Sequence, residues 1–278
     1  MSANDSNGNI DLTIYRQYML HLPNKLNFNA KLENFDYILG FASEDYIEGK
    51  GTGNFNPTWN LNDLSPENVK SFKDNNPQVR VVISIGGVGD EYPFNPFDKN
   101  TWITYAVNSI KQIIVRYDQI HKYENLIDGI DIHYDSVESN EDDFSYCVGE
   151  VIKQLKNDAP LSINVVSIAP TKKVESYYEK LYLDNKDMID LVDYQFYNQE
   201  FSSEDEVVEL YKKLVVTYSP CKVLPGYTNP PDPILMDGIM YLIKNKLVPG
   251  VFVWNANHST TGFNSFFIEN MLLADQES

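Results

Sequence analysis

The sequence predicts a single (β/α)8 barrel that spans residues 1–278. The length suits this fold, which typically takes about 250 residues. Short apolar runs rich in β-branched residues alternate with longer amphipathic segments, and this alternation is typical of βαβ units and a parallel sheet. Eight strand-then-helix units in one chain favour a closed barrel over an open sheet. A polar start, over about residues 1–10, is expected to be flexible.

The predicted strands are mostly continuous apolar runs, as expected for strands that are buried on both faces. In chain order they are Ile14–Tyr18, Tyr37–Ala42, Arg80–Ile85, Leu126–Ile132, Ser162–Ile168, Leu191–Phe196, Lys222–Gly226 and Gly250–Trp254.

Between the strands, apolar residues at helical spacing predict helices. These stretches are Thr101–Arg116, Asp142–Leu155, Glu204–Val216 and Pro233–Lys246. A further helix is predicted to begin at Ser65-Pro66-Glu67, with Ser65 as the N-cap and proline at the first position. The segment Ser43–Asn62 is rich in Gly, Asn and aromatic residues, and we predict a long loop there.

The net charge of −18 excludes some classes of partner. A chain this acidic repels phosphate backbones and anionic membrane surfaces, so we expect no nucleic-acid and no membrane partner. No stretch approaches the roughly 20 apolar residues needed to span a bilayer. The start MSANDSNGNI has neither the basic nor the apolar region of a secretory signal. We therefore expect a cytoplasmic or otherwise intracellular protein, unless a signal was removed.

The cysteines carry no sign of a metal or redox function. Cys147 and Cys221 form neither a metal-binding spacing nor a disulfide framework, and we interpret them as unpaired thiols. We expect no cofactor and no metal, and we expect a monomer.

The most informative segment contains the fourth predicted strand and its end, and reads LIDGIDIHYD from Leu126 to Asp135. Residues 131, 133 and 135 are two apart, so their side chains project from the same side of the strand. In a barrel that side faces the lumen, and catalytic groups of this fold lie at the strand ends. The segment therefore predicts a site or the remnant of one, with a purely structural polar network as the alternative.

Burial of unpaired charge is costly, so the polar side chains of this segment must find partners. We expect Asp131, His133 and Asp135 to contact one another, or to contact lumen side chains such as Ser84 and Tyr197.

Four motifs together resemble the family-18 glycoside hydrolases, the chitinase and hevamine family. Asp128–Asp135 is similar to the signature Asp-Gly-x-Asp-x-Asp-x-Glu. Val81–Gly87 resembles the Ser-x-Gly-Gly motif of strand three, Asp193–Asn198 resembles the strand-six motif with Gln and Tyr, and Gly250–Trp254 resembles the strand-eight motif that ends in Trp. The motifs occur in family order. The resemblance implies a ligand-binding cleft lined by Ser84, Gly86, Gly87, Gln195, Tyr197 and Trp254.

A closer resemblance is to a legume group that comprises the narbonin seed globulins and the Rubisco-associated proteins. It is carried by Asp36–Ala42, Asn125–Tyr134 and Ile163–Pro170. It implies a storage or vegetative-storage role in a plant, and Rubisco becomes a possible protein partner by this resemblance alone.

Two departures from the family signature predict that the site is inactive. The resemblance places the general acid at Asp135, where active members have Glu, and places His133 where they have a neighbouring Asp. Asp128 and Asp131 remain, as do Gln195 and Tyr197, which the resemblance assigns to the acetamido group of the substrate. The degenerate motif is thus Asp128, Asp131, His133 and Asp135, with no catalytic residue expected.

The chemistry of the family explains why these changes matter. The acetamido oxygen of the substrate is the nucleophile, so the protein must supply one well-placed acid and a carboxylate that stabilises the oxazolinium. The Asp135 carboxyl falls short by roughly 1 Å, and misplacement of that size can cost about 10²-fold in rate. Loss of general-acid help typically costs about 10²- to 10⁴-fold. A cationic His133 would oppose the oxazolinium and hold Asp135 ionised.

Three functions follow from the sequence. The first is a catalytically inactive, narbonin-like storage protein, with at most weak carbohydrate binding. The second is a carbohydrate-binding or protein-interaction module that reuses the cleft, and the third is a weak or altered glycosidase. Trp254 and Tyr197 lie at predicted strand ends and suit sugar stacking, whereas for Tyr46 and Trp59 packing of the long loop is the simpler interpretation.

Overall fold

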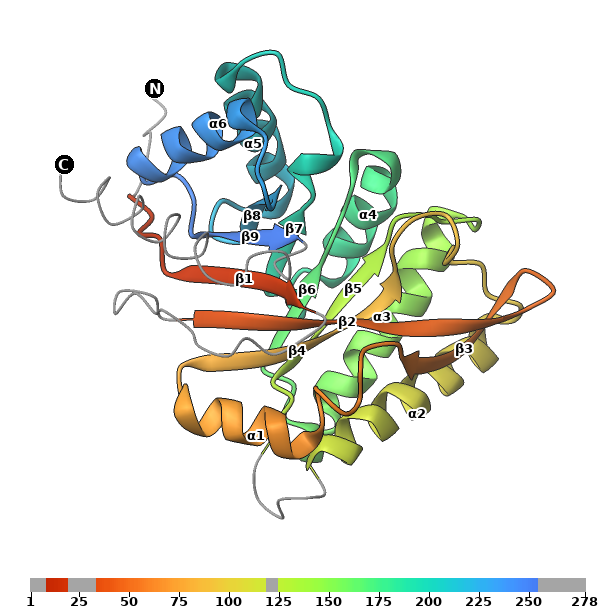
Figure 1. The fold of residues 1–278 in the computed structure, drawn as a ribbon. Coiled ribbons are helices and arrows are strands. Elements are labelled where there is room, and N and C mark those ends of the chain that lie inside the picture. The colour runs from red at the N-terminus through yellow and green to blue at the C-terminus, as the bar shows by residue number, and fades with distance from the viewer. Residues whose placement is uncertain (1–8, 20–33, 119–124, 255–278) are drawn as a thin grey trace.

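The computed structural model describes residues 9–19, 34–118 and 125–254. Within them, parallel strands pair in the order β1-β9-β8-β7-β6-β5-β4-β2, and β1 also pairs with β2, which closes a barrel (Figure 1). The predicted (β/α)8 barrel is therefore confirmed. The strands are β1 (Ile14–Met19), β2 (Asn34–Ile47), β4 (Val79–Gly87), β5 (Gly129–Tyr134), β6 (Val165–Ile168), β7 (Leu191–Tyr194), β8 (Val223–Thr228) and β9 (Gly250–Trp254). Most of the polar start predicted to be flexible lies outside the described residues.

Each predicted strand coincides with a strand of the barrel, and β9 has the predicted bounds. The difference that matters for the candidate site is at β5, which runs from Gly129 to Tyr134 rather than from Leu126 to Ile132. Leu126 and Ile127 are buried, which explains why they resemble a strand, but they form the approach to it. The shift places His133 inside β5 and Asp128 before it.

The helices cover the outside of the barrel and agree with the predictions where these were made (Figure 1). They are α1 (Pro66–Asn75), α2 (Lys99–Asp118), α3 (Glu141–Asn157), α4 (Glu175–Asn185), α5 (Glu204–Tyr218) and α6 (Pro233–Lys244). Ser65 caps α1 as predicted, because its side chain accepts a hydrogen bond from the Asn68 N–H. Helix α4 was not predicted, since its buried residues are limited to Tyr178, Leu181 and Tyr182. In the described part of the chain, no helix has the length and apolarity of a membrane span.

The prediction of a long loop over Ser43–Asn62 is wrong. The second half of β2 continues into this segment and pairs antiparallel with β3 (Lys50–Pro57), so the two strands form a hairpin that extends beyond the barrel (Figure 1). Glu48 and Gly49 both have positive φ at the turn, as tight two-residue hairpins require. The inward positions of β3 include Gly51 and Gly53, so the alternation that marks a strand was hidden in the sequence.

Glu44 attaches this hairpin to the rest of the molecule. Its buried carboxylate accepts hydrogen bonds from Gly53 N–H (2.8 Å), Trp102 Nε1–H (2.6 Å) and Tyr134 O–H (3.1 Å), which belong to β3, α2 and β5. A Cβ at Gly51 would lie 2.3 Å from a Glu44 carboxylate oxygen, so only glycine leaves room for this contact. Burial raises the pKa of Glu44 to about 7, although the three hydrogen bonds act to lower it.

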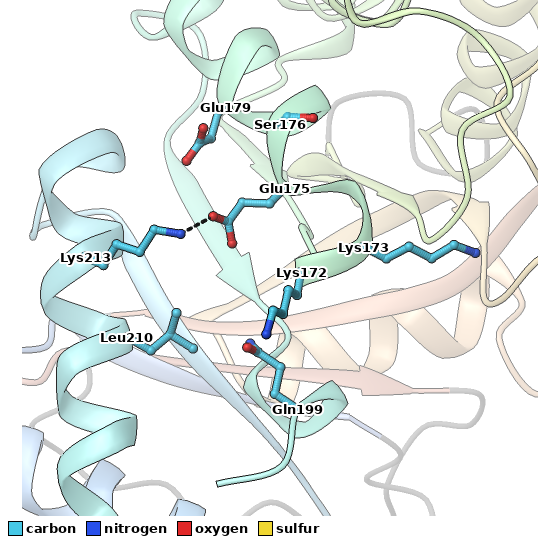
Figure 2. A pocket seen from close by; sticks show the side chains of 8 residues that line it. All are labelled: Lys172, Lys173, Glu175, Ser176, Glu179, Gln199, Leu210 and Lys213. Carbon is cyan, nitrogen blue, oxygen red and sulfur yellow. Dashed lines mark hydrogen bonds and ion pairs between the residues drawn. The ribbon is translucent and has the colours of Figure 1, made fainter.

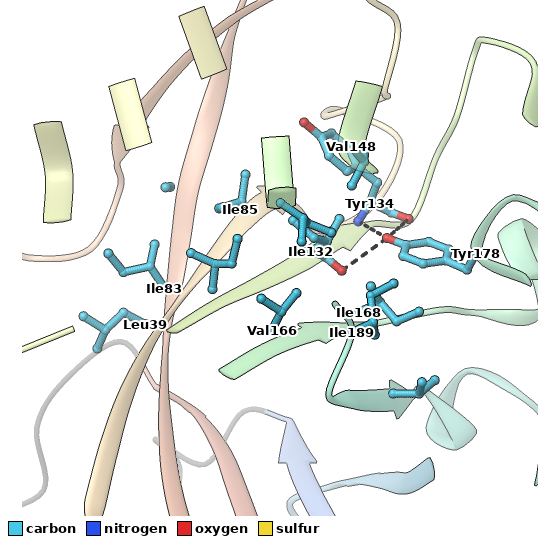
Figure 3. Close-up of a cluster of buried hydrophobic side chains, with 14 of the residues drawn as sticks. Leu39, Ile83, Ile85, Ile132, Tyr134, Val148, Val166, Ile168, Tyr178 and Ile189 are labelled. Carbon is cyan, nitrogen blue, oxygen red and sulfur yellow. Dashed lines mark hydrogen bonds between the residues drawn. The ribbon is translucent and has the colours of Figure 1, made fainter. Parts of the chain in front are cut away.

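Two apolar layers form the core, one outside the barrel wall and one inside it. The outer layer packs the helices onto the strands, as between Val148 or Tyr178 and the β5–β6 region in Figure 3. The inner layer fills the lumen with one side chain from each barrel strand except β5: Tyr18, Ile38, Val82, Val165, Leu191, Leu224 and Phe252. The lumen is therefore packed at its centre, and polar groups that point into it share a confined space.

Replacement of Glu44 tests the pH response of the hairpin anchor. Because the pKa of Glu44 is raised in the folded state, its contribution to stability is complete below the unfolded pKa and is lost as the pH rises through about 7. The free energy of unfolding of the unmodified protein should therefore fall between pH 5 and 8 by an extra amount, on the order of 3 kcal/mol, that Glu44→Gln lacks. Urea unfolding of both proteins at several pH values measures the difference. An identical fall in the two proteins would contradict this role of Glu44.

Candidate active site

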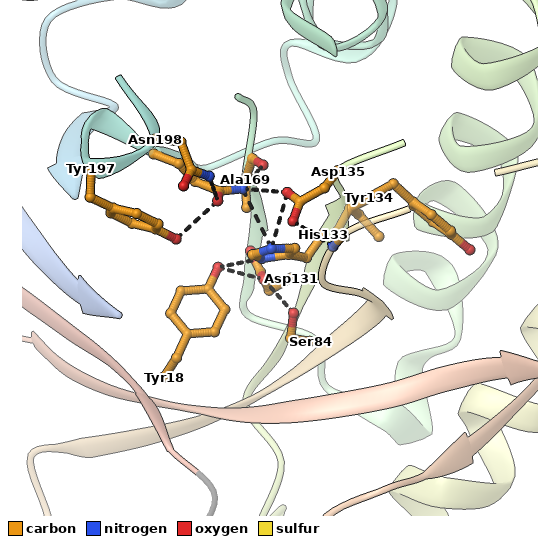
Figure 4. Close-up of polar contacts among 12 residues, drawn as sticks. Tyr18, Ser84, Asp131, His133, Tyr134, Asp135, Ala169, Tyr197 and Asn198 are labelled. Atoms are coloured by element: carbon orange, nitrogen blue, oxygen red, sulfur yellow. Dashed lines mark hydrogen bonds and ion pairs between the residues drawn. The ribbon is translucent and has the colours of Figure 1, made fainter. Parts of the chain in front are cut away.

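The candidate site lies at the carboxyl end of β5, where three polar side chains follow one another along one face. Asp131 and His133 are inside the strand and Asp135 is the residue after its end. As the period of two requires, Asp131 and His133 point into the lumen and are almost fully buried, and the side chain of Asp135 is 13% exposed. Figure 4 shows the three side chains above Ser84 of β4 and beside Tyr18 of β1.

Asp131 is fully engaged by hydroxyl groups of three neighbouring strands. Its Oδ2 accepts from Tyr18 O–H at 2.8 Å and from Ser84 O–H at 2.7 Å, and its Oδ1 accepts from Ser167 O–H at 2.7 Å. These contacts confirm the prediction that the polar side chains along this face of β5 find partners in the lumen. Asp131 is fully buried, and these bonds link β5 to β1, β4 and β6 inside the lumen.

His133 occupies a ring of aromatic side chains. Its imidazole centre lies 5.1 Å from that of Phe41, 5.5 Å from Tyr18 and 5.7 Å from Trp254. Its Nδ1 lies 3.5 Å from the Tyr18 oxygen, whose own proton is directed to Asp131. Its Nε2 lies 3.4 Å from Asp135 Oδ1 (Figure 4). The imidazole therefore fills space next to Trp254, the residue that the sequence predicted as a stacking platform.

Asp135 is held as a carboxylate. Its Oδ2 accepts from Gly89 N–H at 2.9 Å, and its Oδ1 accepts from the Gln195 amide at 3.0 Å. Burial acts to raise the pKa of Asp135, but the contacts with His133, Gly89 and Gln195 outweigh it and hold the pKa below its ordinary value. A group in this state accepts hydrogen bonds and does not donate a proton near neutral pH.

Gln195 and Tyr197 are tied to each other rather than directed to an open space. The Gln195 Oε1 accepts from Tyr197 O–H and from Asn198 Nδ2, both at 2.9 Å. The Gln195 Nε2 donates to Asp135 and, at 2.9 Å, to the Ala169 carbonyl. The Tyr197 ring stacks beside Trp254 with centroids 6.4 Å apart and an interplanar angle of 16°. The polar ends of both residues are thus occupied, whereas their partner Trp254 offers a partly exposed ring.

Gly86 and Gly87 allow the strands to approach closely at this end of the barrel. A Cβ at Gly86, where φ is +114°, would lie 2.2 Å from the His133 carbonyl oxygen. A Cβ at Gly87 would lie 2.6 Å from the ring of Tyr92. The glycines of the motif therefore have a packing role in this structure, and their contact with a ligand stays a prediction.

Asp128 does not join the other members of the motif. It precedes β5, and its Oδ2 accepts from Lys73 Nζ at 2.6 Å and from Val81 N–H at 2.7 Å. Because β4 and β5 are parallel, Val81 marks a point well before the strand ends that carry the site. Asp128 therefore fastens α1 to the amino-terminal part of the barrel, away from the other residues of the sequence motif.

A buried ion cluster deeper in the lumen was not predicted. Arg16 is fully buried on β1, and it pairs with Asp36 of β2 at 2.9 Å and with Asp193 of β7 at 2.5 Å. Arg80 of β4 adds a two-point contact to Asp36 at 2.6 and 2.9 Å. Burial raises the pKa of Asp193 to about 7 against the pull of Arg16, and the nearby Asp131 charge adds to the rise. Two guanidinium groups thus face the carboxyls of Asp36 and Asp193 inside the barrel.

Other sequence-based candidates have structural roles. Trp59 is 4% exposed and donates from Nε1 to Tyr117 at 2.9 Å, and Tyr46 donates to the Pro93 carbonyl at 3.0 Å, as the packing interpretation predicted. Cys147 is buried and Cys221 exposed, and both are free thiols. Among the described residues, no group of three or more His, Cys, Asp or Glu side chains is placed to hold a metal ion.

A separate hollow of about 400 Å³ lies between α4 and α5 (Figure 2). Glu175 pairs there with Lys213 at 2.6 Å, and Lys172 and Glu179 add a charge of each sign. Its lining has no aromatic ring on which a sugar could stack, so we do not regard it as a saccharide site.

The family assignment rests on the order of these elements and on comparison with known proteins. The model for "Glycosyl hydrolases family 18" matches residues 36–218. This range runs from β2 to α5 and includes Asp131, His133 and Asp135. The chain belongs to this family. It is 30% identical to Chitinase 1 of Tulipa saxatilis subsp. bakeri over 92% of this chain and 84% of that protein. It is 25% identical to the RuBisCO-associated protein of Glycine max, over 87% of this chain and 89% of that protein.

Solved structures agree with this assignment. The catalytic domain of the family-18 chitinase from the fern Peteris ryukyuensis superposes with a TM-score of 0.78 at 28% identity, covering 95% of this chain and 98% of that one. Human YKL-39, at 16% identity and a TM-score of 0.53, shares the fold over 77% of this chain and 66% of that one. Identity to the tulip chitinase exceeds identity to the soybean protein, so the finer resemblance to the legume group stays a proposal.

Substitution of Arg16 tests the buried ion cluster. Arg16→Met leaves Asp193 without its cation in the lumen, and loss of one partner of a buried pair costs about 3–5 kcal/mol of stability. Arg80→Met is the matched control, with an expected cost of about 1–2 kcal/mol, because Asp36 keeps Arg16. Thermal or urea unfolding of the two variants measures both costs. A loss for Arg16→Met no larger than that for Arg80→Met would show that the cluster does not carry this energy.

Proposed function

We propose that this family-18 protein does not hydrolyse chitin. The observation that carries the proposal is the state of Asp135, which the resemblance to the family signature assigns to the general acid. A general acid must hold a proton at the working pH and lie within hydrogen-bond reach of the leaving oxygen. Asp135 instead accepts hydrogen bonds from Gly89 and Gln195 and has a lowered pKa.

The neighbours of Asp135 support the same conclusion. His133 replaces the carboxyl that would share a proton with the acid and raise its pKa, and the remaining Asp131 is saturated by three hydroxyl groups. Gln195 and Tyr197, the groups that the resemblance assigns to the acetamido group, are hydrogen-bonded to each other. An acetamido sugar would have to displace these internal bonds, each worth about 1 kcal/mol, before it could be gripped.

For the biological role, we propose storage of the narbonin type inside a plant cell. The net charge of −18 favours solubility at high concentration, which a storage protein needs. The 25% identity to the soybean RuBisCO-associated protein makes association with Rubisco a related proposal.

A carbohydrate-binding role is the alternative that the site favours most. The stacked rings of Tyr197 and Trp254 at the barrel mouth are a surface on which a sugar ring can pack. Human YKL-39 is described as a pseudo-chitinase with retained chitooligosaccharide binding, so loss of activity and loss of binding are separable in this fold. A weak or altered glycosidase is the third candidate, and turnover distinguishes it from the others.

Reversion of Asp135 and His133 to the family residues tests the proposed lack of chitin hydrolysis. We expect no turnover of a fluorogenic chito-oligosaccharide by the unmodified protein. Asp135→Glu restores the length of the acid side chain but leaves it beside the His133 imidazole. His133→Asp restores the neighbouring carboxyl but leaves the acid side chain at residue 135 too short. We therefore expect little activity from either single variant and a larger gain from the double variant than from both singles together, because these groups act as a unit.

The same assay provides the contradicting outcomes. Clear turnover by the unmodified protein would refute the proposal directly. If Asp135→Glu alone reached the turnover of the double variant, the length of the acid side chain would be the limiting factor. The ionised state of Asp135 would then not be the cause of the inactivity. Circular dichroism of each variant controls for the fold.

A further inference from the structure

Among Asp131, His133 and Asp135, only Asp135 is exposed enough for a ligand to touch. Its side chain is 13% exposed, whereas His133 is 1% exposed and Asp131 is fully buried. Both Asp135 oxygens are oriented by fixed donors, Gly89 N–H on Oδ2 and the Gln195 amide on Oδ1. The candidate site therefore presents one oriented carboxylate at its mouth.

Little positive charge balances this carboxylate. In residues 9–19, 34–118 and 125–254, no Lys or Arg forms an ion pair with Asp135, and His133 at 3.4 Å is its one potentially cationic neighbour there. Lys173, on the loop after β6, is paired with Asp90. Arg16 lies deeper and is committed to Asp36 and Asp193. Asp135 is therefore an anion at the mouth that no Lys or Arg of the described residues pairs with, and an unpaired anion favours a cationic ligand group.

The polar groups at the mouth suit an ammonium better than an acetamido group. An acetamido group needs both a donor and an acceptor, but Gln195 and Tyr197 already satisfy each other. An ammonium has three donors and needs acceptors alone, and a carboxylate provides them. The nearby rings of Tyr197 and Trp254 supply the flat apolar face that a pyranose ring packs against, and aromatic rings also attract a cation.

We propose that the barrel mouth beside Asp135, Tyr197 and Trp254 binds sugars with a free amino group, the glucosamine units of deacetylated chitin, with the ammonium paired to Asp135. The inference rests on the proposed loss of chitin hydrolysis, because it requires Asp135 to serve as an anchoring anion rather than as an acid. The specificity it assigns is opposite to that of a site built for N-acetylated sugar: the amino group is recognised by its charge.

Isothermal titration with two matched tetramers tests the proposal. The tetramer of glucosamine and the tetramer of N-acetylglucosamine are titrated at pH 6, where the amino groups are protonated, and in about 0.15 M salt, which screens the overall charge of the chain. A charge-assisted contact predicts that the glucosamine tetramer binds about 10- to 100-fold more tightly. This comparison uses the unmodified protein, so it stays decisive even where a variant fails to fold.

Two variants locate the contact. Asp135→Asn should lower the affinity for the glucosamine tetramer about 10- to 100-fold. Asp187→Asn makes the same charge change at an exposed position before β7, at the opposite end of that strand from the cleft, and should leave the affinity within about twofold.

Three results would overturn the inference. They are equal binding of both tetramers, no binding of the glucosamine tetramer, and equal losses in the Asp135 and Asp187 variants, which would indicate attraction to the overall charge. Failure of the proposed function has a different readout, because it appears as turnover of the acetylated substrate. Absence of turnover together with absence of glucosamine binding would reject this inference alone.

Discussion

Charge inside a closed barrel requires internal partners, and this requirement governs the structure at both levels of the lumen. Strand β5 alternates with a period of two, so Asp131 and His133 must point inward. Water cannot solvate them there, and each charge is matched by groups from neighbouring strands. Hydroxyl groups of β1, β4 and β6 serve Asp131, and the Arg16 guanidinium serves the carboxyls below it.

The same requirement acts on Asp135 at the mouth of the lumen. Donors that stabilise the Asp135 carboxylate also remove its ability to deliver a proton, because they favour the ionised form. Gln195 connects this effect to ligand binding, since its amide donates to Asp135 while its carbonyl accepts from Tyr197. One internally satisfied network therefore joins Asp135, Gln195 and Tyr197. It leaves a carboxylate and a stacking surface at the mouth.

Much of the fold was predictable from the sequence, because parallel strands of a barrel are buried on both faces and appear as apolar runs. The lumen contacts of Asp131 followed from spacing and from the cost of buried charge. The hairpin was not predictable, since β3 turns Gly51 and Gly53 inward, where room for Glu44 and α2 matters more than apolar area. The start of β5 was predicted too early because Leu126 and Ile127 are buried outside a strand.

The Arg16 cluster was missed for a different reason. A charged residue in an apolar run gives no sign of its partners, and Asp36 and Asp193 meet Arg16 only when β1, β2 and β7 close around one lumen. Such pairings depend on the register between strands, which spacing within a single strand does not contain.

The ionisation state of Asp135 is the central claim, and its side-chain carboxyl carbon reports that state directly. In protein labelled with ¹³C at the aspartate carboxyls, the signal absent from Asp135→Asn identifies the residue, and its chemical shift is followed against pH. The account predicts a titration midpoint below the ordinary value of about 3.9, because His133, Gly89 and Gln195 hold the carboxylate. A midpoint above about 5 would contradict it, since Asp135 would then retain the proton that a general acid requires.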